Sequence, residues 1–429
     1  MKHLSRWLCT AAITAGLAVP TASYATNGMF LIGYGTKARG VGGVAIAMPQ
    51  DSLAGAVNPA TIGFVKSRAD VGGDIFLPTA ESELGDLRME SRANLFAMPA
   101  MGGVYGFNRK VTMGFSAVPY GGGGSRYNTN LFNASSGSNP DATLGVNLMV
   151  MQMNPTVSYK INRQNSIGAS LVFAIQTFRA FGLSYFETFT QSFVDNAGTV
   201  TGLTNNGNDW AYGAGTRIGW MGKFMDKKLS LGAVYSSRVY MTKFEKYTDL
   251  FAEQGDLDTP ANVGVGISYK FTPKLTLGMD ITHTFYEDVA AIGNASAQKG
   301  PGSVYPNADE KHRLGNPDGL GFGWENQTVF KLGAIYDYND RWTLRAGWNY
   351  GESPIDETNG EILMNIVAPA VTQNHLTLGA TYSPAKRIEW SFSYVHAFEF
   401  EQNGPTFIGD SGELSMFQNS FGVSFGYKI

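Results

Sequence analysis

From Arg68 to the C-terminus, the chain repeats one pattern, in which apolar side chains occupy every second position until a break interrupts them. A period of two is typical of a β-strand, because successive side chains point to opposite faces of a sheet. In the last stretch, one face carries only large apolar residues, namely Phe421, Val423, Phe425, Tyr427 and Ile429. The residues between them are small or polar, so the strand has one apolar and one polar face.

The polar faces distinguish a soluble sandwich from a barrel in a membrane. A soluble sheet would expose many Lys and Glu residues, whereas these faces consist mostly of Gly, Ser, Thr and Asn. Charged residues make up 16% of the chain, compared with about 25% in a typical soluble protein. Beyond the N-terminus, the sequence has no apolar run of the ~20 residues that a transmembrane helix needs. We therefore expect an all-β fold, a transmembrane antiparallel β-barrel with its apolar face in lipid.

The breaks between strands alternate in length, which gives the strand count and the orientation. Short breaks such as 108–110 and 272–273 contain turn-forming residues and are expected to face the periplasm. Long connections such as 120–146 and 289–323 are expected to lie outside the cell. Fourteen strands follow, an even number with both chain ends in the periplasm. The predicted strands are 68–79, 92–107, 109–119, 147–160, 163–180, 210–223, 227–241, 260–271, 274–288, 324–339, 341–352, 371–384, 386–401 and 414–429.

The N-terminus has the pattern of an export signal. Lys2 and Arg6 precede an apolar stretch, and residues 22–25 form a small-x-small pattern of the kind that signal peptidase cleaves. We expect cleavage after Ala25, so that residues 1–25 are a signal peptide. The alternative, an N-terminal anchor helix, is disfavoured because the apolar stretch is short and is interrupted by a glycine and a proline.

The composition gives no support for catalysis or metal binding. Cys9, the only cysteine, lies in the predicted leader, which excludes disulfides and cysteine-ligated metals from the mature chain. No two of its four histidines have metal-ligand spacing, and no nucleophile elbow or phosphate-binding loop occurs. We expect no catalytic residues, no metal and no cofactor, although a Ser/His pair formed across strands stays open as an alternative. The formal net charge of -3 gives no reason to expect a nucleic-acid partner.

Residues 26–66 precede the first strand and do not alternate. They are rich in small residues and moderately apolar, whereas a disordered arm would be more charged. We expect this segment to fold as a small hatch, or plug, inside the lumen, with residues 67–429 forming the barrel. The alternative is an ordinary periplasmic extension.

The same segment carries several recognisable motifs. They are Gly35-x-x-x-Arg39-Gly40, Gly42-Gly43-x-Ala45, Asp51 and Asn58-Pro59-Ala60, directly after the leader. With these motifs, the chain resembles the FadL family, the outer-membrane channels for long-chain fatty acids and related hydrocarbons, which includes the toluene-type transporters. The length, the fourteen strands and Pro119-Tyr120-Gly121 extend the resemblance over the mature chain. One departure is the C-terminal Ile429, because family members commonly end in an aromatic residue that the barrel-assembly machinery reads.

The resemblance implies a passive channel in the outer membrane of a Gram-negative cell. Such a channel takes up hydrophobic compounds, foremost long-chain fatty acids, through its extracellular loops and releases them laterally into the membrane. An acyl chain gains about 0.8 kcal/mol per methylene on leaving water, so no energy source is needed. The implied partners are the hydrophobic ligand, outer-membrane lipid and lipopolysaccharide, and the barrel-assembly machinery, with the protein acting as a monomer. The alternatives are a general diffusion porin, which would have about 16 to 18 strands, and a structural or adhesive barrel.

Three groups of residues are candidates for ligand binding. Four lie at the start of the hatch, where they are expected to touch ligand deep in the lumen: Asn27, Gly28, Met29 and Phe30. Four apolar residues of the loop 181–209 are expected to lie on one face of a short helix and capture ligand: Leu183, Phe186, Phe189 and Phe193. Four basic residues are candidates to bind a carboxylate, because the alternation along their strands places them on inner faces: Arg217, Arg238, Lys331 and Arg345. For the loop 181–209, the alternative is a cap that packs on its neighbours. For the four cations, the alternative is an ion pair with other inward-facing charged residues.

Five further residues are expected to brace or gate the hatch. Asn58, Pro59 and Ala60 are expected to hold the hatch against the wall, because Asn ties backbone groups and Pro fixes the chain direction. In the family, a kink in the third strand opens a gap in the wall beside the hatch. Here, Pro119 and Gly121 interrupt the chain at the end of that strand, and both residues weaken strand pairing. The alternative is that Pro119 only ends the strand.

Overall fold

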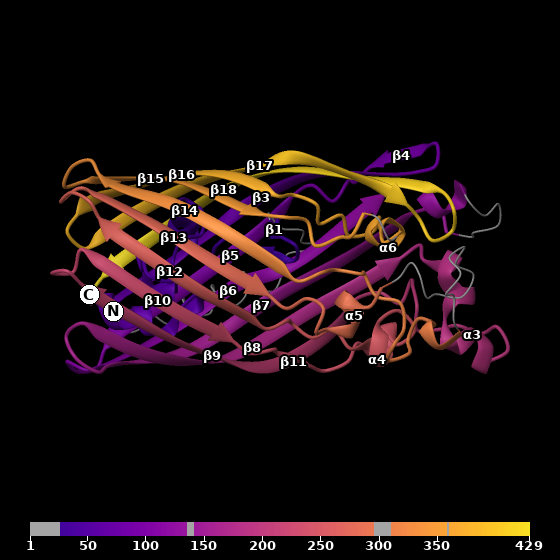
Figure 1. The fold of residues 1–429 in the computed structure, drawn as a ribbon, viewed down its shortest axis with the longest axis horizontal. Helices are drawn as coiled ribbons and strands as arrows, with labels where there is room; N and C mark the ends of the chain where they lie inside the picture. The colour runs from indigo at the N-terminus through magenta and orange to yellow at the C-terminus, as the bar shows by residue number, and fades with distance from the viewer. Residues whose placement is uncertain (1–25, 135–140, 296–309, 358–359) are drawn as a thin grey trace, which may run out of the picture.

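The computed structural model describes residues 26–134, 141–295, 310–357 and 360–429. The predicted signal peptide, residues 1–25, lies outside the described residues. Within these ranges, the chain forms a closed antiparallel barrel with short turns at one end and long loops at the other (Figure 1). The C-terminus lies at the end with the short turns, as expected for an outer-membrane barrel.

The described chain contains an 18-stranded sheet, of which four strands are short additions and the other fourteen form the wall. The wall closes where β18 pairs with β3. The wall strands are β3 (Arg68–Leu84), β5 (Phe96–Gly106), β6 (Val111–Tyr127), β7 (Leu144–Lys160), β8 (Asn165–Phe181), β9 (Asp209–Phe224), β10 (Leu229–Ser236), β12 (Asn262–Lys270), β13 (Leu275–Thr284), β14 (Gln327–Asp337), β15 (Trp342–Gly351), β16 (Asn374–Ala385), β17 (Ile388–Pro405) and β18 (Ser411–Lys428). The short strands are β1 (Thr26–Asn27), β2 (Phe30–Leu31), β4 (Leu87–Glu90) and β11 (Tyr240–Met241).

The fourteen-strand barrel is confirmed, and the differences lie mainly at the outer strand ends. The sequence predicts the third strand over 109–119, but β6 continues to Tyr127. Likewise, most of the predicted loop 402–413 belongs to β17 and β18. Backbone groups keep pairing beyond the point where the apolar alternation stops, so the alternation does not mark the strand ends.

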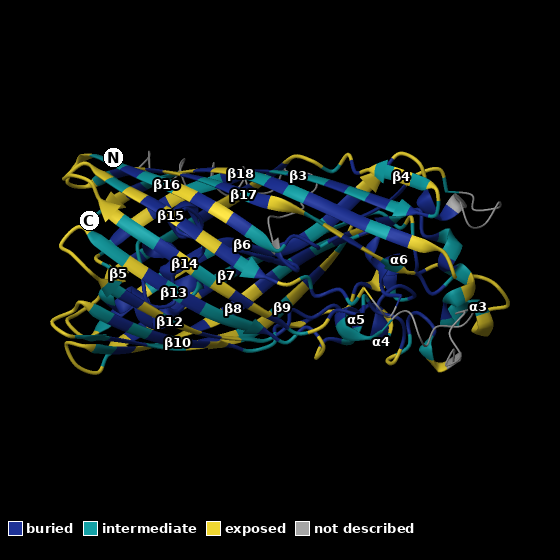
Figure 2. Cartoon of the chain, turned by 45° about the horizontal axis from the view of Figure 1, so that its top comes forward, coloured by how far each residue is buried: buried dark blue, intermediate teal, exposed yellow. Residues whose placement is uncertain are grey.

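The outward faces of the strands are apolar in the part of the barrel that lies towards the short turns. Exposed and buried positions alternate along each strand (Figure 2). Large apolar side chains that a soluble protein would bury are about half exposed, including Ile218 at 56% and Phe421 at 51%. In a bilayer, these side chains contact lipid.

The helices are short and lie either in the N-terminal segment or in the outer loops (Figure 1). In the N-terminal segment they are α2 (Thr36–Arg39), η1 (Ser52–Ala56) and η2 (Pro59–Phe64). In the loops they are η3 (Leu131–Ala134), η4 (Ser184–Phe189), α3 (Gln191–Asp195), η5 (Glu245–Tyr247), α4 (Ala252–Gly255), α5 (Ala290–Gly293), η6 (Glu310–His312) and α6 (Ile362–Asn365). Among the described helices, none has the length and apolar character needed to cross a membrane.

The N-terminal segment lies inside the barrel, as the hatch prediction requires. Its helix α2 contacts β3, β16, β17 and β18, whereas η2 contacts β6, β7, β8 and β9. The segment therefore touches the wall on several sides. Ile32, Val41 and Ile62 are fully buried between the segment and the wall. Small residues make this packing possible, because the backbones of hatch and wall approach closely: a Cβ on Gly40 would lie 2.9 Å from the Cα of Gly379 in β16.

Candidate functional site

The larger part of the hatch, residues 36–64, is fixed to the wall and is called the hatch body here. Its Asn58 side chain donates hydrogen bonds to the carbonyls of Ile46 (2.9 Å) and of Trp220 in β9 (3.0 Å). The side-chain oxygen of Asn58 accepts from Ala60 N–H (3.0 Å) and so caps η2. At Gly219 of β9, an added Cβ would lie 2.0 Å from Asn58 Oδ1, so the wall has no side chain at this contact. These contacts show how Asn58-Pro59-Ala60 lies against the wall.

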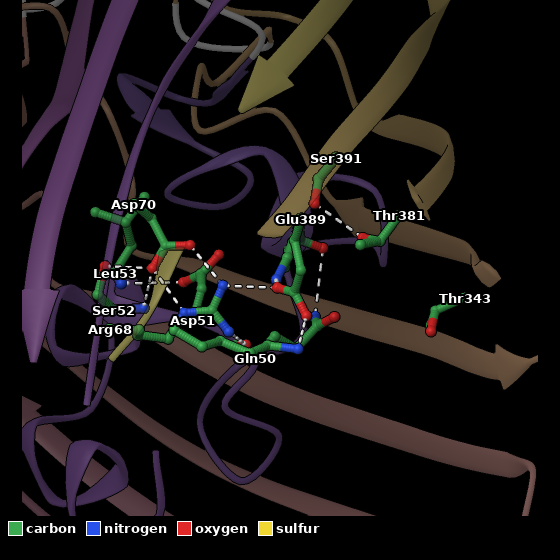
Figure 3. Close-up of polar contacts among 12 residues, drawn as sticks. Gln50, Asp51, Ser52, Leu53, Arg68, Asp70, Thr343, Thr381, Glu389 and Ser391 are labelled. Carbon is green, nitrogen blue, oxygen red and sulfur yellow. Dashed lines mark hydrogen bonds and ion pairs between the residues drawn. The ribbon is translucent and has the colours of Figure 1, made fainter. Parts of the chain in front are cut away.

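An ion-pair network joins the hatch body to wall strands on both sides of the β18–β3 pairing that closes the barrel (Figure 3). Glu389 of β17 accepts from Lys37 Nζ of the hatch (2.7 Å) and from Arg68 of β3 (2.7 Å). Arg68 also binds Asp70 through two nitrogens at 2.6 and 2.9 Å. Asp70 in turn accepts from the backbone and hydroxyl of Ser52 in the hatch, at 3.0 and 2.6 Å. Because all these charges are buried, removing one partner would leave another uncompensated.

Two more contacts hold the hatch body on the side of β13 and β16. One carboxylate oxygen of Asp280 accepts from the backbone N–H groups of Ala45 (2.7 Å) and Ile46 (2.9 Å). The Thr377 hydroxyl accepts from the N–H of Gly42 at 2.8 Å. The hatch body is therefore held from several directions.

The first residues of the hatch, 26–34, form a separate unit that is called the hatch tip here. Its strands β1 and β2 make a tight hairpin, and Gly28 at the turn has a φ of +59°. The Tyr286 hydroxyl accepts from Met29 N–H (3.3 Å) and donates to the carbonyl of Asn27 (3.1 Å). Its ring stacks on Phe30 with centroids 5.7 Å apart. Tyr286 thus contacts three successive parts of the hairpin, a role that no sequence pattern indicated.

Strand β6 is irregular at Pro119, but it does not end there. Its pairing with β7 shifts by one residue between Pro119 and Gly121, which leaves a bulge at Tyr120. Its pairing with β5 stops at Ala117, and the next backbone contact on that side is Arg126, which accepts from Arg92 N–H at 2.8 Å. In the described chain, the wall therefore lacks backbone pairing between β5 and β6 over residues 118–125. We call this opening the lateral gap.

The hatch tip fills the lateral gap. Phe30 of β2 pairs with Gly121, and Met29 accepts from Gly122 N–H at 3.0 Å. Leu31 packs on an apolar cluster of the wall strands β3 and β5. Tyr34 stacks on Tyr120 with centroids 5.1 Å apart. The tip therefore closes the wall, through its backbone on the side of β6 and through its side chains on the side of β3 and β5.

An apolar cavity of about 60 Å³, called the outer pocket, lies on the extracellular side of the tip. Met29 of the tip forms part of its wall, and the side chains around it come from β6, β7, β8 and the outer loops. They include Phe178, Phe251, Trp324 and Leu148. All twelve residues that line this pocket are apolar or glycine, so the pocket is suited to an uncharged hydrocarbon group.

A second cavity of about 70 Å³, called the inner pocket, lies on the other side of the tip and has a mixed lining. Phe30, Tyr34 and Tyr120 contribute apolar surface, and Arg217, Lys331 and Asp280 contribute charges. The formal charge of its lining is therefore +2 - 1 = +1. This pocket reaches the lateral gap, because Tyr34 and Tyr120 belong to both.

Arg217 is buried, with 2% of its surface exposed, yet its hydrogen-bond partners are neutral. The guanidinium donates to Ser236 Oγ (2.6 Å), Gln152 Oε1 (3.3 Å), Asn154 Oδ1 (3.4 Å) and the carbonyl of Ala56. Among the described residues, no carboxylate makes an ion pair with it. The Tyr120 ring lies 5.7 Å from the guanidinium, so the positive charge at this side of the inner pocket is met by neutral groups alone.

The other three candidate cations have different environments. Lys331 lines the inner pocket and donates to the carbonyl of Ile32 at 3.2 Å. Arg345 is engaged by the hatch body through Gln50 (2.5 Å) and does not line either pocket. Arg238 lies beyond the end of β10 and forms an ion pair with Asp258 of the following loop at 2.6 Å. The structure thus brings only Arg217 and Lys331 together with the hatch tip.

The loop that the sequence assigns to ligand capture packs as a cap. Instead of one short helix it forms η4 and α3, which are separated at Thr190. Leu183 and Phe186 are only 3% and 2% exposed, and Phe186 packs edge-on against Phe132 at 4.8 Å. Phe189 is partly buried in the same cluster, whereas Phe193 lies apart on α3. The expected apolar face is therefore not presented to solvent, because the loops bury most of it against one another.

The part of the chain that the structure describes contains no group of three or more His, Cys, Asp or Glu side chains arranged to hold a metal.

Comparisons with known proteins agree with this architecture. A sequence model of the outer membrane protein transport protein family (OMPP1/FadL/TodX) matches residues 8–406. The chain belongs to this family. The family consists of outer-membrane transport channels and not of enzymes, and the closed barrel of the described chain agrees with it.

Solved structures share the fold at low sequence identity. The toluene transporter TodX of P. putida is 18% identical, with a TM-score of 0.68, over 93% of this chain and 99% of that one. A FadL homologue of Pseudomonas aeruginosa is 17% identical, with a TM-score of 0.69, over 94% and 99% of the two chains.

The long-chain fatty acid transport protein of Escherichia coli K12 is 28% identical over 106 residues, which are 24% of this chain and 23% of that protein. The match to this curated relative thus spans about a quarter of its length.

Proposed function

We propose that this family member is a passive channel that moves long-chain fatty acids from outside the cell into the outer membrane. The proposed route enters the outer pocket, passes the hatch tip into the inner pocket, and leaves through the lateral gap. Among its relatives, the E. coli protein is named for long-chain fatty acids and TodX for toluene, so the choice of substrate depends on the lumen of this chain.

The charge of Arg217, which is met by neutral groups alone, is the observation that favours a fatty acid. A buried guanidinium is costly unless an anion pairs with it, and its planar donors suit a carboxylate. The inner pocket has a formal charge of +1 and apolar surface beside it, which matches a ligand with one carboxylate and a hydrocarbon chain. Toluene would leave this charge unpaired.

The fixed hatch body supports lateral release. A route straight through the lumen would require the buried ion pairs at Glu389 and the hydrogen bonds of Asn58 to break together. Opening the lateral gap requires the tip to move, with Leu31 and Tyr34 and the short backbone pairing of Met29 and Phe30 with β6, but it breaks no β5–β6 hydrogen bond and none of the ion pairs of the hatch body. Transfer of the acyl chain into lipid is downhill, by about 0.8 kcal/mol per methylene.

Uptake of labelled oleate and labelled toluene tests the proposal in cells that lack their own channel. We expect the wild-type protein to take up oleate. Arg217→Met should reduce oleate uptake about tenfold or more, because a hydrogen-bonded charge pair contributes roughly 1.5–3 kcal/mol. Arg217→Lys should retain part of the uptake, and Arg238→Met, which changes a cation outside both pockets, should behave like the wild type.

The outcomes separate the alternatives. Unchanged oleate uptake by Arg217→Met would refute the carboxylate role, and toluene uptake without oleate uptake would indicate an aromatic-hydrocarbon channel. A general diffusion porin would take up neither selectively and would conduct ions strongly in a planar bilayer. The proposed channel should conduct poorly, because the hatch fills its lumen.

A further inference from the structure

The lipid-facing side of the barrel has a hollow of about 700 Å³ across β7, β8, β9, β10 and β12. Its rim consists of large outward side chains, including Tyr159, Ile218 and Tyr235, which are 42%, 56% and 45% exposed. Small residues such as Ala169 and Ala233 lie between them. The hollow is separate from the outer and inner pockets, since it opens towards lipid.

One end of the hollow is polar. The Lys110 ammonium, from the turn between β5 and β6, lies 3.5 Å from the Tyr159 hydroxyl and 5.8 Å from the centre of the Tyr159 ring. On the same side of the hollow, Trp220 donates its indole N–H to Asn165 at 3.2 Å. Lys110 is exposed and makes no ion pair with a carboxylate of the described residues. The hollow is thus apolar along its length and basic at its periplasmic end.

The surrounding periplasmic turns are basic as well. The three turns 107–110, 161–164 and 225–228 contain five basic side chains and one acidic side chain, which gives a formal charge of +5 - 1 = +4. The basic residues are Arg109, Lys110, Arg163, Lys227 and Lys228, and the acidic residue is Asp226. Basic side chains at a membrane surface attract anionic lipid headgroups, by about 1 kcal/mol each.

We propose that this hollow binds an anionic phospholipid of the periplasmic leaflet. One acyl chain lies along the hollow against Ile218 and Trp220, and the phosphate is bound by Lys110 and the Tyr159 hydroxyl. The basic end of the hollow selects an amphiphile with a negative headgroup over an uncharged hydrocarbon. A second copy of the chain is a poor occupant, because it would bring two sets of basic turns together. The proposal is independent of the substrate of the channel.

Quenching of tryptophan fluorescence tests the proposal, because Trp220 lines the hollow. Purified protein in detergent micelles is titrated with phosphatidylglycerol or phosphatidylcholine that carries the same brominated acyl chains. The Trp220 component is obtained by subtracting the signal of Trp220→Phe. We expect half-maximal quenching of this component at an about fivefold lower mole fraction of phosphatidylglycerol, the factor that about 1 kcal/mol from one basic residue gives.

Three further variants assign the effect. Lys110→Gln should clearly reduce the preference for phosphatidylglycerol, whereas Lys386→Gln, in the turn between β16 and β17, should leave it unchanged. Ala233→Leu should weaken quenching by both lipids, because the larger side chain occupies the hollow. Each variant is first checked for folding by heat-modifiable migration in gels. Equal quenching by the two lipids, no quenching of Trp220, or a preference that Lys110→Gln leaves unchanged would each overturn the proposal.

Discussion

Replacement of Gly219 by alanine tests whether the hatch body is fixed by close contact with the wall. The added Cβ would lie 2.0 Å from Asn58 Oδ1, 2.9 Å from its Cγ and 3.2 Å from Pro59 Cδ. A real Cβ cannot occupy these positions, so the Asn58 side chain has to move. Gly219 does not have a positive φ, so the alanine itself introduces no backbone strain.

The displaced Asn58 would lose its three hydrogen bonds, to Ile46, Trp220 and Ala60. At about 1 kcal/mol each, the loss is about 3 kcal/mol, which corresponds to a roughly 150-fold change in an opening equilibrium. The barrel itself should stay folded, because its strand pairing is untouched. We therefore expect the hatch body to open more often within an intact barrel.

Hydrogen exchange measured by mass spectrometry on peptides covering residues 44–64 reports this opening directly. In Gly219→Ala, exchange of these peptides should accelerate by about two orders of magnitude, while peptides from β15 and β16 keep their wild-type rates. Gly103→Ala is the matched control, because its Cβ would meet only the Arg68 carbonyl, at 4.0 Å. Wild-type exchange of the hatch peptides in Gly219→Ala, or equal acceleration in the control, would refute this account of how the hatch is held.

Two further predictions concern the hatch tip and an outer loop. Tyr286→Phe keeps the ring but removes the hydroxyl that bonds Asn27 and Met29. For a loss of about 1.4 kcal/mol, hydrogen exchange of residues 26–34 should accelerate about tenfold. An unchanged rate would contradict the role of this tyrosine. In the loop after α4, burial and the neighbouring Asp258 raise the pKa of Asp256 to about 6. The folded loop therefore binds a proton that the unfolded chain has already lost, so its stability is greatest below about pH 4 and falls as the pH rises through 6. Asp256→Asn should abolish this decrease, and an unaltered dependence of loop exchange on pH between 5 and 7.5 would refute it.

The strands and their orientation followed from local sequence. Alternation such as that of Phe421 to Ile429 is a property of one strand, because the period of two is set by the backbone and needs no partner. The turn-forming residues gave the connectivity, and the lack of alternation in residues 26–66 identified the hatch. Strand ends were less predictable, since β6 and β17 continue where glycine and polar residues replace the apolar pattern.

The candidate site was only partly accessible from sequence. The alternation along their strands places both Arg217 and Arg345 on inner faces. Arg345 bonds Gln50 of the hatch and lines neither pocket, whereas Arg217 lines the inner pocket. Pro119 marks an irregularity, but the sequence could not show that β6 keeps its bonds to β7 and loses those to β5.

The amino-acid sequence by itself thus determined the barrel, its strand number, its polarity and the presence of a hatch, because each depends on neighbours along the chain. The tertiary structure alone decided which of the candidate cations, Arg217 and Lys331, border the inner pocket, where the wall opens and what closes it. These features depend on residues far apart in sequence, such as Asn27 and Asn349, which are 322 positions apart and share a hydrogen bond of 2.9 Å. No local period encodes such a contact, because it exists only once the hatch lies inside the closed barrel.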